Sequence, residues 1–370
     1  MRQVSSQSSP TPLRRRPILV TGGAGFIGSN LADRLARDGH DILVYDALAR
    51  PGVDANLEWL KKRHPNKITA VIADIRDESS LVAAAGEVQA VFHLAAQVAV
   101  TTSLIAPRDD FEINVRGTLS LLDALRRRDE RVPLVFASTN KVYGDLADVE
   151  LDKTSDAYVP RDVAIRHTGI GETRPLDFHT PYGCSKGAAD QYVLDYSRSF
   201  GIPTCVLRMS CIYGQRQMGT EDQGWVAHFL IKALRGEPIS IYGDGCQVRD
   251  VLDISDAVEA YVSAWKNIDA VQGRAFNLGG GPANAISLKQ LLVHIETLLG
   301  HSVETVYSDW RAGDQRYYVS DTRRAQQELG LRTPRSWRDG VAALAQWLQA
   351  EKPPAQATAV QQLQAAGGWP

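Results

Sequence analysis

A tyrosine and a lysine stand at a spacing that suits proton transfer. Tyr182 and Lys186 are four residues apart, so on a helix their side chains lie on one face. A free phenol has a pKa of about 10 and is a weak base at neutral pH, but a nearby ammonium group favours its ionised form. The phenolate could then remove the proton of an alcohol while a hydride leaves the same carbon. Because such pairs are common by chance, the spacing alone does not establish catalysis.

Two hydroxyl side chains end an apolar stretch upstream of this pair. Residues 134–138 are predicted to form a buried strand, and Ser138 and Thr139 stand at its end. In parallel sheets, ligands bind beyond the carboxyl ends of the strands. One of these hydroxyls could therefore hold a substrate oxygen beside the phenol. Together with the glycine-rich turn described next, this indicates reversible alcohol–ketone chemistry, and the alternative is a nucleotide-binding protein without catalysis.

Three glycines follow the first apolar stretch at the spacing of a dinucleotide-binding turn. They are Gly22, Gly25 and Gly28. The first permits the tight turn, the second lets the backbone approach a pyrophosphate, and the third allows the following helix to pack closely. Asp46 stands at the end of the next apolar stretch. A carboxylate there can accept hydrogen bonds from both ribose hydroxyls and repels a 2′-phosphate, which favours NAD over NADP.

The elements that must position these residues alternate along the chain. Short apolar stretches predict strands, and amphipathic stretches between them predict helices. The predicted strands are 18–21, 41–45, 68–73, 90–94 and 134–138, and the clearest predicted helices are 28–38 and 111–127. This alternation is typical of right-handed βαβ units and a parallel sheet. We therefore expect an α/β protein with a Rossmann-type doubly wound sheet.

The domain organisation follows from where this alternation weakens. We expect a Rossmann domain at 17–205 and a smaller substrate-binding lobe at 206–352, some of whose segments return to the first domain. Residues 144–180 form a long excursion without clear periodicity. Residues 1–16 are rich in Ser, Pro and Arg and are expected to be a disordered tail, and 353–370 a second tail.

The composition excludes several classes of protein. Lys and Arg number 41 and Asp and Glu 43, a formal net charge of −2, which argues against a dedicated binder of nucleic acid or of a membrane surface. No apolar run approaches the ~20 residues needed to span a membrane. The 4 cysteines and 8 histidines show no metal-ligand spacing, so no metal site is expected. We expect a cytoplasmic protein.

Taken together and in chain order, the motifs of this sequence resemble those of the extended short-chain dehydrogenases/reductases. The resemblance covers about residues 17–350. The resemblance rests on the glycine-rich turn at 21–28, Asp46, Asp74-Ile75, His93-Leu94-Ala95-Ala96, Asn114, the stretch 138–144, Tyr182-x-x-x-Lys186 and 248–251. It implies a Rossmann domain with bound NAD, a C-terminal sugar-nucleotide lobe and a homodimer.

The resemblance also implies roles for single residues. Thr139 would be the hydroxyl partner, Tyr182 the acid and base, and Lys186 its support. The implied cofactor-binding residues are Gly22, Gly25, Phe26, Ile27, Gly28, Asp46, Asp74, Ile75, Leu94, Ala95, Ala96, Asn114 and Lys186. The implied substrate-binding residues are Asn140, Lys141, Cys211, Arg249 and Arg311. For the two arginines, solvated surface charges remain the alternative.

The residues after Thr139 restrict which reactions of this family are expected. Dehydratases of this family carry Thr-Asp-Glu before Val-Tyr-Gly, which supplies an acid and a base for the loss of water. Here Asn140 and Lys141 follow Thr139. An amide cannot protonate a leaving hydroxide at neutral pH, and Lys141 is not a carboxylate base. Dehydration is therefore disfavoured, and oxidation and reduction remain.

Further stretches resemble one subgroup of the family. They are 139–145, 175–186, 222–225, Arg50-Pro51-Gly52 and 56–60, and the subgroup epimerises C2 of CDP-linked 3,6-dideoxyhexoses. The implied reaction is transient oxidation to a keto-sugar and reduction on the opposite face. A CDP-sugar is favoured and a UDP-sugar is possible. Cys211 stands where many members have Asn, which puts the substrate in doubt.

Three alternatives remain open. They are a UDP-sugar 4-epimerase, an NAD-dependent sugar-nucleotide dehydrogenase and, from another class, a non-catalytic NAD-sensing regulator. His179 and Arg166, on the long excursion, could orient a sugar, or they could be loop residues that face solvent.

Overall fold

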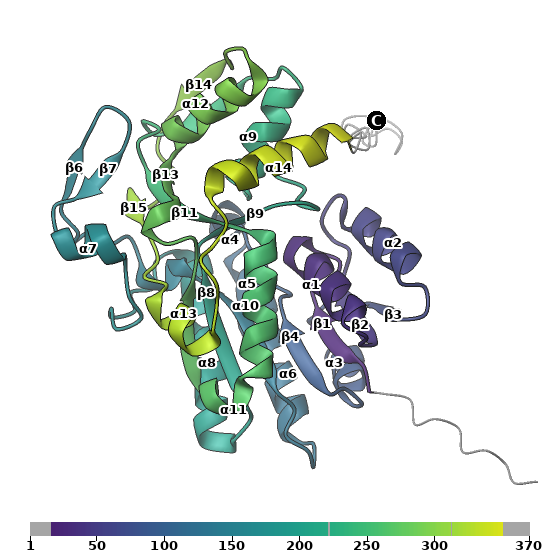
Figure 1. The fold of residues 1–370 in the computed structure, drawn as a ribbon. Helices are drawn as coiled ribbons and strands as arrows, with labels where there is room; N and C mark the ends of the chain where they lie inside the picture. Colours follow the sequence, from purple (N-terminus) through teal and green to yellow (C-terminus); the bar gives the residue numbers. More distant parts are fainter. Residues whose placement is uncertain (1–15, 221–222, 312, 351–370) are drawn as a thin grey trace, which may run out of the picture.

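The computed structural model describes residues 16–220, 223–311 and 313–350. Of the two expected tails, 1–16 and 353–370, only Arg16 lies within the described residues. A seven-stranded sheet of order β12-β8-β5-β4-β1-β2-β3 forms the centre of the molecule, and all its neighbouring strands are parallel (Figure 1). The strand order reverses between β1 and β4, which confirms the expected Rossmann-type doubly wound sheet.

Five strands of this sheet lie within one residue of their predicted bounds, and β8 and β12 have no counterpart among the predicted strands. The seven strands are β1 (Ile18–Thr21), β2 (Ile42–Asp46), β3 (Ile68–Ile72), β4 (Ala90–His93), β5 (Leu134–Thr139), β8 (Thr204–Met209) and β12 (Arg274–Leu278). Strands β1, β4 and β5 are buried along their whole length, as expected of strands covered on both faces. Along β1, Ile18 and Val20 face one hydrophobic core and Leu19 faces the other, because alternate side chains point to opposite faces.

Helices cover both faces of the sheet. One face packs against α1 (Phe26–Arg37), α2 (Val53–Arg63), α10 (Ile254–Lys266), α11 (Ile268–Val271) and α13 (Arg323–Leu329). The other packs against α3 (Glu78–Ala85), α6 (Gly117–Arg126) and α8 (Thr180–Phe200). The short helix α4 (Val100–Ile105) also packs on α8. Helix α8 thus carries Tyr182 and Lys186 to the end of β5.

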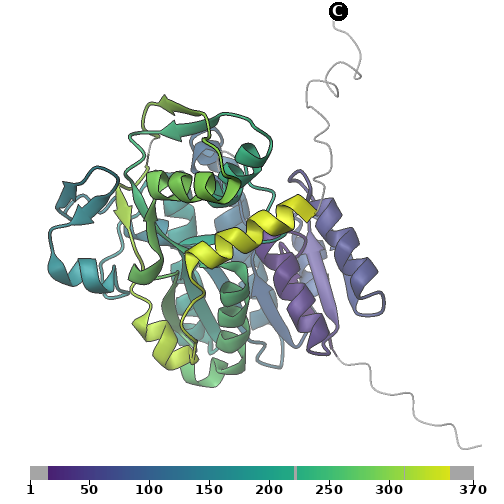
Figure 2. The same ribbon diagram turned by 45° about the horizontal axis from the view of Figure 1, so that its top comes forward.

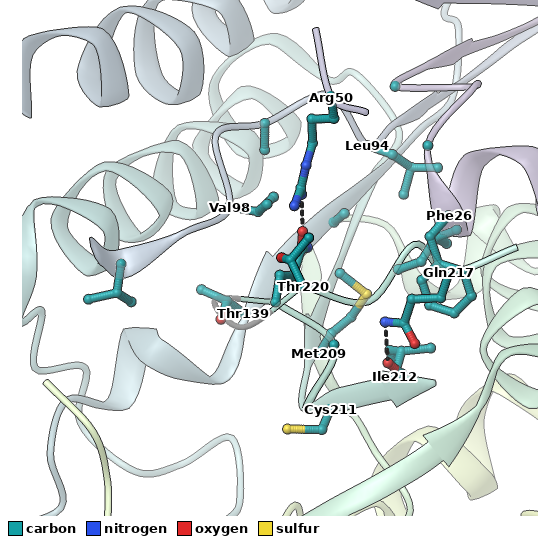
Figure 3. A pocket seen from close by; sticks show the side chains of 18 of the residues that line it. Phe26, Arg50, Leu94, Val98, Thr139, Met209, Cys211, Ile212, Gln217 and Thr220 are labelled. Carbon is teal, nitrogen blue, oxygen red and sulfur yellow. Dashed lines mark hydrogen bonds between the residues drawn. The ribbon is translucent and has the colours of Figure 1, made fainter. Parts of the chain in front are cut away.

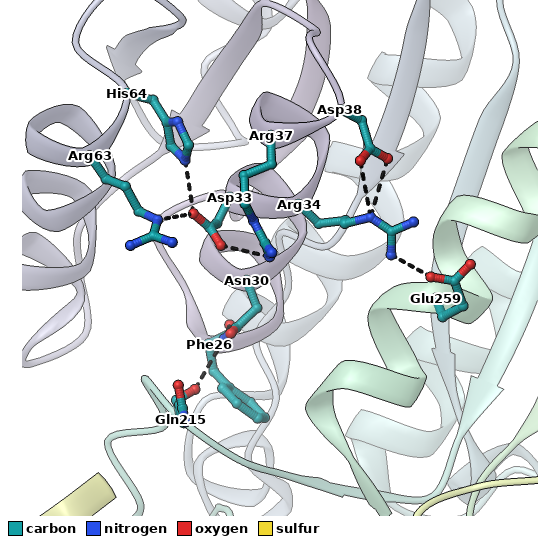
Figure 4. Close-up of polar contacts among 10 residues, drawn as sticks. All are labelled: Phe26, Asn30, Asp33, Arg34, Arg37, Asp38, Arg63, His64, Gln215 and Glu259. Carbon is teal, nitrogen blue, oxygen red and sulfur yellow. Dashed lines mark hydrogen bonds and ion pairs between the residues drawn. The ribbon is translucent and has the colours of Figure 1, made fainter.

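Polar contacts fix α1 against its neighbours (Figure 4). Arg34 of α1 pairs with Glu259 of α10, and Asp33 pairs with Arg63 and accepts a hydrogen bond from His64 at 2.8 Å. Asp33 and Arg34 both lie in the second half of α1, away from the glycine-rich turn at its start.

A smaller lobe is built from strands and helices of the second half of the chain. Strands β10 (Ile239–Tyr242) and β14 (Thr305–Ser308) pair with each other, and β11 (Val248–Asp253) pairs with β9 (Cys211–Tyr213), β13 (Ala285–Ser287) and β15 (Tyr317–Tyr318). Helices α9 (Trp225–Leu234), α12 (Leu288–Leu299) and α14 (Trp337–Ala350) and the 3-10 turn η3 (Pro282–Asn284) complete it. Figure 2 shows α14, in yellow, extending from this lobe towards α1 and α2.

Two predicted regions differ from the structure. The single helix expected at 111–127 consists of α5 (Pro107–Phe111), the π-helical turn η1 (Glu112–Arg116) and α6. Hydrophobic periodicity does not reveal a π turn, because the apolar face continues through it. The excursion at 144–180, which begins after the 3-10 turn η2 (Asn140–Tyr143), contains a hairpin of β6 (Leu151–Lys153) and β7 (Tyr158–Pro160), followed by α7 (Val163–Thr168).

Candidate active site

The glycine-rich turn brings three segments into close contact. Gly22 has a φ of +66°, and a Cβ on it would lie 2.7 Å from the Ala95 nitrogen at the end of β4. A Cβ on Gly28 would lie 2.1 Å from the Gly22 oxygen, so only glycine lets α1 start this close to the turn. Gly25 is the N-cap of α1, and no side chain caps this helix. The first amides of α1 are therefore available to a phosphate group.

A cavity of about 610 Å³ opens beside this turn, at the carboxyl edge of the sheet (Figure 3). All the expected cofactor residues except Asn114 line it: Gly22, Gly25, Phe26, Ile27, Gly28, Asp46, Asp74, Ile75, Leu94, Ala95, Ala96 and Lys186. It is also lined by Thr139 and Tyr182 and by all the expected substrate residues, Asn140, Lys141, Cys211, Arg249 and Arg311. The structure thus brings the residues singled out from the sequence into one cavity.

Asp46 is held in place by backbone amides. Its two carboxylate oxygens accept hydrogen bonds from the Ala24 nitrogen at 3.0 Å and the Leu48 nitrogen at 2.9 Å. Each oxygen has a second lone pair, so the carboxylate can still accept from a ribose diol. The glycine cradle, the uncapped helix and this carboxylate fit the pyrophosphate and ribose of a dinucleotide.

Asn114 lies behind the cavity wall rather than in it. Its side-chain nitrogen donates to the Gln97 oxygen at 3.1 Å and to the Ser185 hydroxyl at 3.0 Å, and its side-chain oxygen accepts from the Gln97 nitrogen at 2.9 Å. Ser185, on the catalytic helix, also donates to the buried Asp110 carboxylate. Asn114 is therefore placed to support α8 and the segment after β4, not to contact a ligand directly.

The Tyr182 phenol is buried and meets the expected hydroxyl partner. The neighbouring Thr139 hydroxyl, which donates to Asn140 Oδ1 at 3.3 Å, acts to lower the pKa of the phenol. Burial has the larger effect and raises the pKa of Tyr182 to about 12, so without further positive charge the phenol is protonated at neutral pH. The Tyr182 nitrogen donates to the Ser103 hydroxyl at 3.2 Å, which ties the start of α8 to α4.

Lys186 is buried at the end of β5. Its Nζ donates to the Ala137 oxygen at 2.7 Å and lies 4.2 Å from the centre of the Phe136 ring. Burial lowers the pKa of Lys186 to about 7, although the carboxylates of Asp190 and Asp110 oppose this shift. Lys186 Nζ is thus held at the end of β5, in the cavity that Thr139 and Tyr182 also line.

Asn140 and Lys141, which directly follow β5, join the sheet to the lobe. The Asn140 side-chain nitrogen donates to Gln315 Oε1 at 3.2 Å, and Lys141 Nζ donates to the Gly313 oxygen at 2.8 Å. Burial, with a contribution from Arg249, lowers the pKa of Lys141 to about 8. Lys141 therefore retains most of its positive charge at neutral pH within the cavity.

The expected nucleotide-binding arginines differ in their surroundings. Arg249 is buried and donates to Asp314 Oδ1 at 2.6 Å, so the alternative of a solvated surface charge is wrong for it. Arg311 lies with its guanidinium carbon 3.7 Å from the centre of the Tyr242 ring. Cys211 lies at the start of β9, and burial raises the pKa of its thiol. It is therefore a neutral group in the cavity.

Part of the cavity wall has no motif in the sequence, and two residues that were only possible sugar contacts lie outside the cavity. Residues after β9 line the cavity although no motif singled them out, among them Arg216, Gln217 and Met218. Neither His179 nor Arg166 lines it. His179 instead pairs with two carboxylates, and Arg166 donates to the Pro160 oxygen at 2.8 Å.

A dinucleotide cradle and a buried tyrosine–threonine pair at the edge of a Rossmann sheet are the features of a dinucleotide-dependent enzyme. Residues 18–279 match the model of the NAD dependent epimerase/dehydratase family. The chain belongs to this family, as its motifs predicted, and its cofactor is NAD.

Relatives and solved structures agree with this assignment. The chain is 41% identical over 346 residues to CDP-paratose 2-epimerase of Salmonella typhi, covering 89% of this chain and 98% of that one. It is 32% identical over 337 residues to a putative UDP-glucose 4-epimerase of Methanocaldococcus jannaschii, covering 90% and 98%. UDP-glucose 4-epimerase of Thermotoga maritima, solved with UDP-glucose, superposes with a TM-score of 0.77 at 30% identity, covering 90% and 99%. The Thermus thermophilus UDP-glucose 4-epimerase, solved with NAD, gives 0.75 at 28% identity, covering 90% and 99%.

No described helix is long and apolar enough to cross a membrane. Among the same residues, no group of three or more His, Cys, Asp or Glu side chains could hold a metal ion.

Proposed function

We propose that this enzyme epimerises C2 of a CDP-linked 3,6-dideoxyhexose, as a CDP-paratose/CDP-tyvelose 2-epimerase. One observation carries this proposal: the Thr139–Tyr182 hydroxyl pair shares a cavity with the NAD-binding turn, while Asn140 and Lys141 stand where a dehydratase needs two carboxyl groups. The relative at 41% identity is named a CDP-paratose 2-epimerase, which supports the choice of substrate.

In this mechanism Tyr182 carries the proton. When bound, NAD supplies a reversible hydride acceptor at the sugar carbon. Tyr182 takes the proton of the sugar hydroxyl during oxidation and returns it after the keto-sugar has turned its other face. Thr139 holds the same oxygen, because its hydroxyl lines the cavity together with Tyr182. The Lys186 ammonium lowers the cost of the phenolate and can also bind the nicotinamide ribose.

The lobe holds the rest of the substrate. Arg249 and Arg311 provide positive charge for the diphosphate and nucleoside, and Asn140 and Lys141 contact the sugar. Arg249 is buried and Lys141 is partly buried, so their charges are less screened by water than those on the surface. We expect this side of the cavity to keep the nucleotide fixed while the sugar reorients.

The second candidate is a UDP-sugar 4-epimerase. It is favoured by the relatives and solved structures of that activity that match over about nine-tenths of this chain. The two candidates share the cofactor and the proton carrier and differ in the nucleotide and in the carbon that inverts.

Incubation with single nucleotide sugars tests the proposal. The purified protein is given CDP- or UDP-linked sugars, and the configuration at C2 and C4 is followed by NMR. We expect inversion at C2 of the CDP-sugar without added NAD. Inversion at C4 of a UDP-sugar alone supports the second candidate, and net formation of NADH without any epimer supports a dehydrogenase instead.

A tyrosine variant separates an enzyme from a non-catalytic NAD-sensing regulator. Tyr182→Phe keeps the ring but removes the proton carrier, so we expect turnover to fall about 10²–10⁴-fold with NAD still bound. Full biological activity of this variant would contradict a catalytic role.

We also propose a cytoplasmic homodimer with the domain boundaries expected from the sequence, 17–205 and 206–352. Support for a dimer comes from apolar side chains exposed on α4 and α5, which pack against α8. They are Leu104, Ile105 and Phe111, of which Ile105 is 86% exposed.

A further inference from the structure

A segment of the lobe crosses over to the Rossmann domain beside the cofactor end of the cavity. It comprises residues 214–220, between β9 and α9, and is called the strap below. Four of its residues, Arg216, Gln217, Met218 and Thr220, line the same cavity as the glycine-rich turn. Figure 3 shows Gln217 beside Phe26, at the start of α1. The strap is thus a wall of the cavity that the proposed mechanism does not use.

Two buried or partly buried amides join the strap to the glycine-rich turn. Asn30 of α1 donates to the Phe26 oxygen at 2.9 Å and to the Gln215 oxygen at 3.0 Å (Figure 4). Asn56 of α2 donates to the Ala24 oxygen and to the Arg216 oxygen, each at 3.2 Å. Each amide therefore bridges the turn and the strap, and the strap cannot lift without breaking both bridges.

The loop between β2 and α2 forms the other side of this contact. Arg50 donates to Gln223, just beyond the strap, and a Cβ on Gly52 would lie 2.8 Å from Met218 Cγ. Arg50-Pro51-Gly52 and residues 56–60 are the stretches that the sequence singled out without a chemical role. In the structure, residues of both stretches contact the strap.

Arg216 fastens the strap between two tryptophans. Its φ is +69°, a conformation that is uncommon for a residue with a side chain and that the surrounding contacts must hold. Its guanidinium carbon lies 4.2 Å from the centre of the Trp59 ring on α2 and 5.4 Å from that of Trp347 on α14. Cation–π contacts of this kind stabilise by roughly 0.5–2 kcal/mol, more when shielded from water.

Two buried acceptors at this contact have no partner among the described residues. They are Asn56 Oδ1 and Gln217 Oε1. Both Asn56 and Gln217 are more than nine-tenths buried, and both line the cavity. The orientation of the Asn56 amide is fixed, because its nitrogen donates to two backbone oxygens. A buried acceptor without a donor is unfavourable, so this contact is suited to a ligand that brings hydroxyl or amide donors.

We propose that the strap retains NAD between turnovers and that Arg216, held between Trp59 and Trp347, keeps it closed. This inference rests on the proposed function, in which the sugar is oxidised and then reduced by one and the same cofactor molecule. Release of the reduced cofactor before the second step would leave a keto-sugar product and an inactive protein. A cavity wall that must open for NAD to leave prevents this loss.

The test measures NAD release in the absence of any sugar. Holoprotein is mixed with excess isotopically labelled NAD, and exchange of the bound cofactor is followed for the wild type, Arg216→Met and Trp347→Leu. We expect exchange about tenfold faster in Arg216→Met, because one desolvated cation–π clamp is lost. Arg216→Lys keeps a cation over the two rings, so its NAD exchange rate should lie between those of the wild type and Arg216→Met.

Arg63→Met is the matched control. Arg63 lies over the same Trp59 ring, at 5.8 Å, but belongs to α2 and pairs with Asp33 instead of the strap. Its removal should leave NAD exchange unchanged. Melting temperatures of all variants separate loss of the strap contact from loss of the fold, and Trp347→Leu tests the same clamp from the other side.

The outcomes distinguish the two proposals. Equal exchange rates in wild type, Arg216→Met and Trp347→Leu overturn the strap and leave the proposed function standing. A wild-type protein that exchanges NAD as fast as mixing allows also overturns the strap. A wild-type protein that binds no NAD overturns the proposed function together with the strap.

Discussion

Lys141 places an amine in this cavity where a dehydratase of the family has a carboxylate. Its side-chain amine is charged below its lowered pKa of about 8 and neutral above it. We predict that the KM for the nucleotide sugar rises as the pH increases through 8, while Lys141→Met has a higher KM without this inflection. Steady-state kinetics between pH 6.5 and 9.5 measure both.

The exposed Lys61→Met provides the control for this prediction. Lys61 pairs with Glu58 on the surface of α2, far from Lys141 in the fold. It should reproduce the wild-type profile. A KM inflection that persists in Lys141→Met would assign the titration to another group.

His93 links the cofactor turn to the segment that supports the catalytic helix. Its Nδ1 lies 2.6 Å from the Thr21 hydroxyl and its Nε2 lies 2.9 Å from the Thr118 hydroxyl. The Thr118 hydroxyl donates to the Asn114 oxygen at 2.6 Å, so its own oxygen must accept from His93. The proton of the neutral ring therefore lies on Nε2, and Thr21 donates to Nδ1.

Burial gives this histidine a stability effect that depends on pH. It lowers the pKa of His93 to about 3, against about 6.5 in the unfolded chain. Between these values the unfolded chain binds one more proton than the folded one. We predict that the free energy of unfolding falls by about 1.4 kcal/mol per pH unit from this group as the pH drops below 6.5.

Urea denaturation at pH 7, 6 and 5 measures this slope. In His93→Gln the amide has no proton to gain, so the His93 contribution of about 1.4 kcal/mol per pH unit should disappear from the slope. The free energy of unfolding at pH 7 should also fall. Identical slopes in the two proteins would show that His93 accepts a proton in the folded state as readily as in the unfolded one.

At the scale of elements, the strands and the glycine-rich turn could be predicted and the connections could not. Strand β1 is a continuous apolar run buried on both faces, and such runs are visible in the sequence. The strap depends on Arg216 meeting Trp59 and Trp347, residues far apart in the chain. Gln315 likewise accepts from Asn140 and donates to the Gly144 oxygen, although both are far from it in the chain. Contacts of this kind leave no local pattern.

The close packing of α1 on its turn predicts the effect of one methyl group. In Gly28→Ala the new Cβ meets the Gly22 oxygen, which is backbone and cannot rotate away. We predict a loss of about 1–3 kcal/mol of stability and weaker NAD binding, because α1 must shift away from the turn. Thermal unfolding and NAD titration measure the two effects.

Gly171→Ala is the control for this change. A Cβ there would meet only Asp321 Oδ2, at an ordinary 3.7 Å, and the glycine does not have a positive φ. Gly171→Ala should change neither the stability nor the affinity for NAD. Normal NAD binding by Gly28→Ala would contradict the expected role of this glycine.

At the scale of the whole molecule, the exposed apolar residues of α4 and α5 predict self-association. Ile105 is the most exposed of them, and a charge there would have to be buried in a dimer. We predict that Ile105→Glu is monomeric at concentrations where the wild type is dimeric, as measured by light scattering after size exclusion. Val163→Glu, an exposed apolar position on α7, should remain dimeric. A wild type that is monomeric at all concentrations would contradict the homodimer.

Helix α14 has a consequence for how the enzyme is loaded. It contributes Trp347 to the clamp on Arg216, although it is the last helix of the described chain. A ribosome exposes the glycine-rich turn long before it has synthesised this helix. If the strap retains NAD as proposed, a chain whose α14 has not yet docked lacks half of this clamp. Retained NAD would then report that α14 has docked.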